Sequence, residues 1–212
     1  MRVPIILAAV SIGTLAAAVV FGVTHRDSQK EVRTTQLHVD GVPSDLPSLA
    51  DVMKRTEAVV VAQVLSSRPS SIAPQGMKDD AGTFISTAYV VRVSEVISWP
   101  SEKERPVSLE VELPGLGDVD RGPYIQRFKS EHVRPLSVGA TYVLFVRQHS
   151  LGRRPSAPLV WIPATNDDQS IVEVRGGRLA PRASTRLSAD ISRMTLAKLV
   201  DDVKNLARGG RR

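Results

Sequence analysis

The chain has 212 residues and a formal net charge of +6, and it contains no Cys. The absence of Cys excludes disulfide staples, thiolate nucleophiles and thiolate metal ligands, so packing must stabilise the fold. The positive charge lies at one end: residues 175–212 hold ten Arg or Lys against three Asp, a net of +7, whereas the other residues hold eighteen against nineteen acidic side chains, a net of −1. A uniformly basic body, the usual mark of a nucleic-acid-binding domain, is therefore excluded.

Residues 1–23 are dominated by an uncharged apolar run from Val3 to Val23. As a helix this run would span about 30 Å, the thickness of the hydrocarbon of a bilayer. Two interpretations stay open, a secretory signal with an Ala16-x-Ala18 cleavage site or an uncleaved membrane anchor. Both predict a body that is secreted or held outside the cell membrane by a single span. The cations that follow the run oppose that orientation under the positive-inside rule; they are Arg26, Lys30 and Arg33.

Residues 24–47 mix charges with one Gly and two Pro and have no apolar period, which predicts a linker. Ser48 then has the character of a helix N-cap, because Asp51 follows three residues later and can meet the free N–H groups. Apolar residues at spacings of three and four predict a short helix that ends near Thr56.

The middle of the chain has the patterns of β-strands. Residues 58–65 are apolar at nearly every position, which is typical of a strand buried on both faces. Residues 84–97 and 107–113 alternate between apolar and polar side chains, and we expect them to form an antiparallel pair with one face exposed to water. Further strands are predicted at 136–146, 159–162, 171–175 and 178–179, the last two joined by a Gly176-Gly177 hairpin turn.

The last predicted element is a helix over residues 195–208 with one apolar stripe, which Gly209 ends. The whole pattern predicts a mainly β fold over residues 48–208. We expect a partly open antiparallel barrel of the OB-like kind, with the short helix before it, the C-terminal helix closing one side, and a basic tail at 209–212.

No catalytic or metal-binding motif is evident. The histidines are scattered and lack zinc-site spacing; they are His25, His38, His132 and His149. Asp118-x-Asp120 begins like a calcium loop, but Lys129 stands where a bidentate Glu is required. The polar clusters at Asp167-Asp168 and Glu131-His132-x-Arg134 are interpreted as solvated loop residues. The sequence therefore predicts no enzyme, no cofactor and no metal site.

Several stretches in chain order resemble a diffuse group of small secreted or membrane-anchored bacterial β-domains of uncharacterised function. They are Thr56-Glu57-Ala58-Val59-Val60-Val61-Ala62-Gln63-Val64, then residues 89–97, Leu113-Pro114-Gly115 and residues 135–146. The likeness covers about residues 49–206 and implies no catalytic residues. The element order is also similar to OB-type barrels such as the netrin-like domains of metalloproteinase inhibitors. Those inhibitors chelate zinc with an N-terminal Cys, which this chain lacks, so that mechanism is not implied.

Three hypotheses for function follow. The first is a non-enzymatic binding or interaction module that uses predicted loops at 66–82 and 115–135. The second is binding of an anionic polymer, an envelope glycan phosphate or nucleic acid, by basic residues near the C-terminus; these are Arg182, Arg186, Arg193, Arg208, Arg211 and Arg212. Nucleic acid is the less favoured ligand, because no strand carries the exposed aromatic residues that base stacking requires. The third is a hydrolase in which His132 or His149 approaches a carboxylate. The remaining partner we expect is the membrane itself, if residues 1–23 are not cleaved.

Overall fold

The computed structural model describes residues 30–37, 46–72, 84–121, 123–130, 133–150, 159–165 and 167–209. The predicted signal or anchor at residues 1–23 and most of the predicted linker lie outside these residues, as does the tail beyond Gly209. In the part of the chain that is described, no helix has the length and apolar character needed to cross a membrane.

The fold is mainly β, with short helices, as predicted. Its strands are β1 (Glu31–Leu37), β2 (Ala58–Ile72), β3 (Phe84–Ser98), β4 (Ser108–Pro114), β5 (Gly117–Asp120), β6 (Tyr124–Ser130), β7 (Thr141–Ser150), β8 (Leu159–Pro163), β9 (Ile171–Arg175) and β10 (Arg178–Pro181). Its helices are α1 (Leu49–Met53), α2 (Arg186–Ser192), α3 (Leu196–Gly209) and a 3-10 turn, η2 (Asp168–Ser170).

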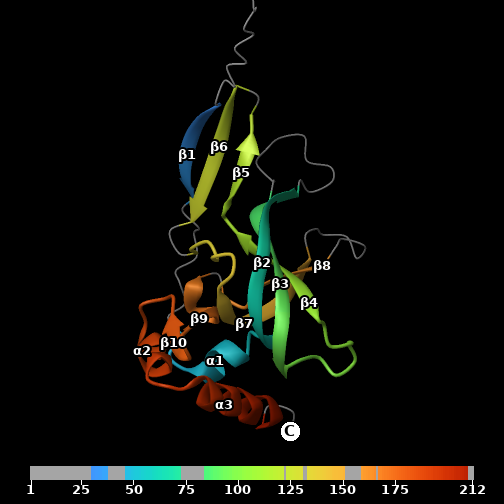
Figure 1. Cartoon of the computed structure of the whole chain (residues 1–212), viewed down its shortest axis with the longest axis vertical. Coiled ribbons are helices and arrows are strands. Elements are labelled where there is room, and N and C mark those ends of the chain that lie inside the picture. The colour runs from blue at the N-terminus through green and yellow to red at the C-terminus, as the bar shows by residue number, and fades with distance from the viewer. Residues whose placement is uncertain are drawn as a thin grey trace, which may run out of the picture.

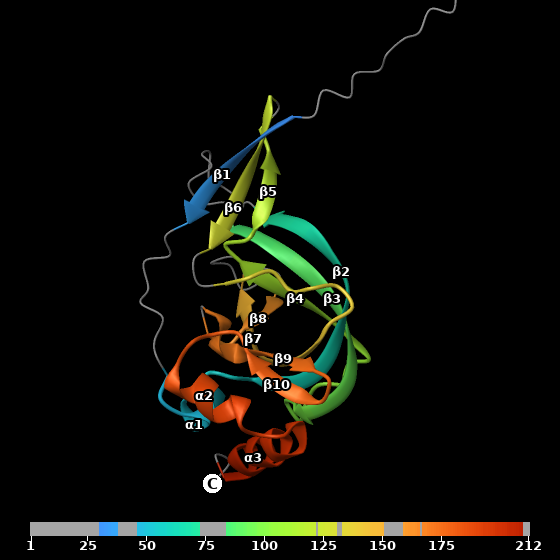
Figure 2. The same ribbon diagram turned by 60° about the vertical axis from the view of Figure 1, so that its left-hand side comes forward.

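The described strands form a seven-stranded sheet in the order β10-β9-β7-β2-β3-β4-β8. Strand β7 also pairs with β8, so β7, β2, β3, β4 and β8 form a closed ring of pairings. The link between β4 and β8 is the parallel pair of Val111 with Trp161, which departs from the all-antiparallel sheet that we predicted. Register shifts between β2 and β3 accompany their curved path around the ring (Figures 1 and 2).

Two apolar cores lie on opposite faces of the sheet, and β2 contributes to both. Val60 and Val64 join the core inside the ring, whereas Val59 and Val61 join the core under the helices. Strand β7 is divided in the same way, with Leu144 facing inward and its neighbours outward. The prediction of strands buried on both faces is therefore confirmed, and each such side chain contributes about 1.5–3 kcal/mol.

The helices cover the outer core. Ser48 caps α1 as predicted, and its hydroxyl accepts a hydrogen bond from Asp51 N. Helix α3 covers the predicted range and buries Leu199 and Val203 beneath it. Helix α2 was not predicted; it begins after Thr185, whose side chain caps it, and is too short to show a period.

A second, three-stranded sheet of β1, β6 and β5, here called the arm, extends from one end of the ring (Figure 1). Strand β1 lies within the predicted linker, and its parallel pairing with β6 corrects that prediction for residues 31–37. Strands β5 and β6 lie where we predicted loop at 115–135, so that prediction is also wrong for these residues. The chain enters the arm at Gly115, where a positive φ of 77° turns it from β4 into β5.

Strand β2 also continues beyond its predicted end at residue 65, through Ile72. Its pairing with β7 stops at Gln63, whereas its pairing with β3 continues. The backbone of Val64 still bonds to Gly139 and Ala140, and beyond it β2 is an edge strand within the described sheet. An edge tolerates Pro69 and polar side chains. The polar residues after Leu65 therefore indicate that β2 has lost its pairing with β7, and not that the strand has ended.

The hairpin between β9 and β10 generates a testable prediction. Gly176 and Gly177 have φ values of 54° and 79°. A Cβ at Gly177 would meet no atom within 4 Å, so Gly177→Ala should cost only backbone strain, about 1–2 kcal/mol of unfolding free energy. Gly209→Ala is the matched control: its Cβ also meets open space and its φ is not positive, so urea unfolding should show almost no change. Equal effects of the two changes would contradict this account.

Candidate functional site

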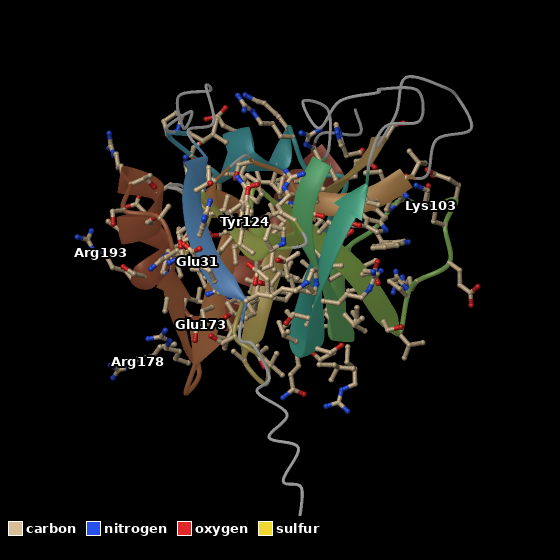
Figure 3. All side chains as sticks on the ribbon, turned by 90° about the horizontal axis from the view of Figure 1, so that it is seen from above. Glu31, Lys103, Tyr124, Glu173, Arg178 and Arg193 are labelled. Carbon is tan, nitrogen blue, oxygen red and sulfur yellow. The ribbon has the colours of Figure 1, made fainter. Side chains whose placement is uncertain are left out.

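The structure separates the basic residues that the sequence grouped as one anion site. Arg186 begins α2 and Arg193 follows its end, and both are exposed. Arg208 lies in the last turn of α3. Arg193 lies on the opposite side of the molecule from Lys103, another cation, which follows β3 (Figure 3). Arg211 and Arg212 lie outside the described residues. The side chain of Arg182 is buried.

Arg182 belongs to a buried ionic network. Its side chain is only 7% exposed, and its Nε lies 3.5 Å from Asp168 Oδ2. Asp168 is 4% exposed and also accepts from Arg134, at 2.8 Å from Nε and 3.2 Å from the backbone N. Burial lowers the pKa of the Arg182 guanidinium, and the charge of Asp168 opposes that shift. Arg182 thus ties the end of β10 to the segment before β7.

Asp168 does not stand in solvent as the sequence suggested. Asp167 is buried beside it, and its carboxylate accepts hydrogen bonds from the backbone N and the side-chain amide of Gln169. Gln169 Oε1 accepts in turn from Leu46 N, at 3.1 Å, which fastens the entry to α1. The interpretation of Asp167 and Asp168 as solvated loop residues is therefore wrong. They satisfy backbone donors in a turn.

A basic groove lies at the end of the molecule occupied by α3. It has a volume of about 580 Å³ and runs between α3 and the connection from β3 to β4. Its cations are Lys103, Arg105, Lys204 and Arg208. Among the described residues that line it none is acidic, although Glu95 Oε1 lies 3.4 Å from Lys204 Nζ. The groove therefore has a positive potential that Glu95 offsets only in part.

The four cations of the basic groove are held to different degrees. Lys103 donates to Gln148 Oε1 and lies 5.5 Å from the centre of the Trp161 ring. Within the described residues, Arg105 and Arg208 form no ion pair or hydrogen bond through their side chains. These two guanidiniums are therefore available for an anion, since a solvated Arg binds oxyanions through a planar fork of donors.

One aromatic side chain, Trp99, contributes to the wall of the groove. Trp99 lines it and packs on Trp161, with ring centroids 5.0 Å apart and a 35° tilt. Trp99 Nε1 is enclosed and has no hydrogen-bond partner among the described residues. The wall gives a ligand an apolar face next to the cations, a combination suited to a sugar ring that carries a phosphate.

The other predicted sites receive less support. Of the predicted loop at 66–82, residues 73–82 lie outside the described part, and so does His132. His149 lies on β7, where it pairs with Val160 of β8. Within the described residues, no three His, Asp or Glu side chains gather as a metal site would require.

No protein-family model matches this chain, and no curated protein does. The function must therefore be argued from the geometry of the chain's own side chains.

Two residues of the buried network, Asp168 and Arg134, should contribute unequally to the free energy of unfolding. Asp168→Ala would leave the Arg182 guanidinium buried without a carboxylate and should cost about 3–5 kcal/mol of unfolding free energy. Arg134 is 59% exposed, so Arg134→Ala should cost only about 1 kcal/mol. Urea unfolding followed by circular dichroism checks both values. A loss for Asp168→Ala no larger than that for Arg134→Ala would contradict the structural role of this carboxylate.

Proposed function

We propose that this chain is a non-enzymatic binding module outside the cell membrane, secreted or anchored by residues 1–23, that holds an anionic polymer in the basic groove. In this proposal the ring of β7, β2, β3, β4 and β8 is an OB-like barrel whose interior is filled, and the ligand binds at its surface. The observation that carries the proposal is the convergence of four cations from two distant segments, with no acidic residue among the described lining.

The proposed ligand is an envelope glycan phosphate and not nucleic acid. Trp99 is the single aromatic side chain among the described residues that line the groove. One aromatic face can receive one ring, whereas single-stranded nucleic acid is held by successive stacked bases. Repeated phosphates would instead meet Arg105 and Arg208, and basic residues continue in the sequence at Arg211 and Arg212.

The placement of the groove also favours a polymer over lipid headgroups. The first described residue, Lys30, precedes β1 at the far tip of the arm, whereas α3 lies at the opposite end of the molecule (Figures 1 and 2). If residues 1–23 anchor the chain, about seven residues join the anchor to that tip and span at most roughly 25 Å. The groove would then face away from the anchoring membrane.

The proposal predicts a specific salt dependence. Affinity for a soluble polyphosphate, measured by fluorescence anisotropy over a salt series, should fall linearly in log–log form. The double change Arg105→Gln with Arg208→Gln should lower affinity and make that slope shallower by about 1.5, because the two phosphate contacts are lost.

The matched control is Arg186→Gln with Arg193→Gln, which removes the same charge from exposed positions at the two ends of α2. This control should bind almost as the unchanged chain does. If both double variants lose the same affinity, net charge and not the groove holds the polymer. If neither loses affinity, the proposed site is wrong.

A further inference from the structure

A second pocket, separate from the basic groove, lies beside the hairpin of β9 and β10. It has a volume of about 290 Å³, just below the usual range for small-molecule sites. The segment before β7 and strands β7, β9 and β10 form it. The polar side chains that line it are Arg134, Ser137, Tyr142, Glu173, Arg175 and Arg182.

The charges around this pocket do not balance. Three guanidiniums line it, from Arg134, Arg175 and Arg182, and two carboxylates face them, Glu173 and Asp168. Glu173 accepts from Arg175 at 2.7 and 2.8 Å. The hydrogen bond from Arg175 holds the pKa of Glu173 below its usual value, and the charges of Arg182 and Arg134 add to this. One positive charge is therefore left over at this pocket.

Two buried donors at this pocket lack acceptors. Arg182 is 7% exposed; its Nη2 donates to Pro135 O, but its Nη1 has no hydrogen-bond partner in the described part of the chain. Tyr142 is 2% exposed, and its hydroxyl oxygen accepts from Ser137 N at 3.0 Å. The hydroxyl proton of Tyr142 meets no acceptor among the described residues. Buried donors left unpaired cost about 1–3 kcal/mol each, so an incoming acceptor has a strong reason to bind.

We infer that this pocket binds the oxyanion of a small molecule, a carboxylate or a phosphate monoester with one negative charge. Such a group balances the excess guanidinium and supplies oxygen acceptors to Arg182 and Tyr142 at once. The Glu173 carboxylate already accepts hydrogen bonds from Arg175, so it competes with the ligand for that guanidinium. The site is independent of the polymer proposed for the basic groove.

Arg175, 71% exposed, and its partner Glu173, 16% exposed, form no hydrogen bond to Asp168 or Arg182 among the described residues and allow a test that leaves those two in place. Inorganic phosphate and acetate are titrated into the full chain, and binding is followed by calorimetry and by thermal unfolding. Glu173→Gln removes the competing carboxylate and should tighten binding about fivefold. Arg175→Gln removes a cation and frees Glu173, and should weaken binding by a similar factor, about fivefold. Tighter binding of phosphate than of acetate would identify the phosphate monoester as the ligand group, and the reverse would identify the carboxylate.

Arg178→Gln is the control. Arg178 is exposed on the same hairpin and points outward from the molecule (Figure 3), so its loss should leave affinity unchanged. The inference is overturned if neither anion binds saturably at millimolar concentration. It is also overturned if Glu173→Gln and Arg175→Gln shift affinity in the same direction, or if only Arg105→Gln with Arg208→Gln abolishes binding, since the anion would then occupy the basic groove.

Discussion

The structure depends on β2 and β7 being buried on both faces. Alternate side chains of these paired strands supply two cores at once, one within the ring and one beneath the helices. Since Val59 and Val60 are fully buried but face opposite cores, a slip of one residue in register would exchange the two sets. The helices α1 and α3 must therefore lie where the outer core is exposed, and their position is fixed by the strands.

That arrangement also determines where charged side chains can gather. The interior of the ring is filled by residues such as Tyr89, Val91 and Leu144, so ligand chemistry is left to the rims and to the junctions between elements. Helix α3 packs on β3, which brings Lys204 and Arg208 beside the connection that carries Lys103 and Arg105. The basic groove is thus a consequence of docking an amphipathic helix on the outer core.

The sequence predicted the elements whose burial is regular and missed those whose partners are distant. Alternation identified β3 and β4, and the two glycines identified the hairpin of β9 and β10. Strand β6 has Phe128 as its buried residue among polar neighbours, and β1 pairs with it in parallel across about 90 residues, so no local period marks either strand. The helix cation pair Lys204 and Arg208 was visible at a spacing of four, but nothing local could link it to the turn near Arg105.

Arg182 illustrates why charge alone misassigns a site. Its sequence neighbours suggested an exposed basic region, yet Asp168 lies 14 positions earlier and becomes its partner only when β9 and β10 fold back. Burial converts a residue that could have bound a polymer in solvent into one that joins two segments and retains one unpaired donor. The same charge therefore acts differently at the two pockets. In the proposed polymer site the groove cations would attract from a distance and weaken with salt, whereas at Arg182 low solvent access makes a missing hydrogen bond costly and would make binding of the proposed anion depend on fit.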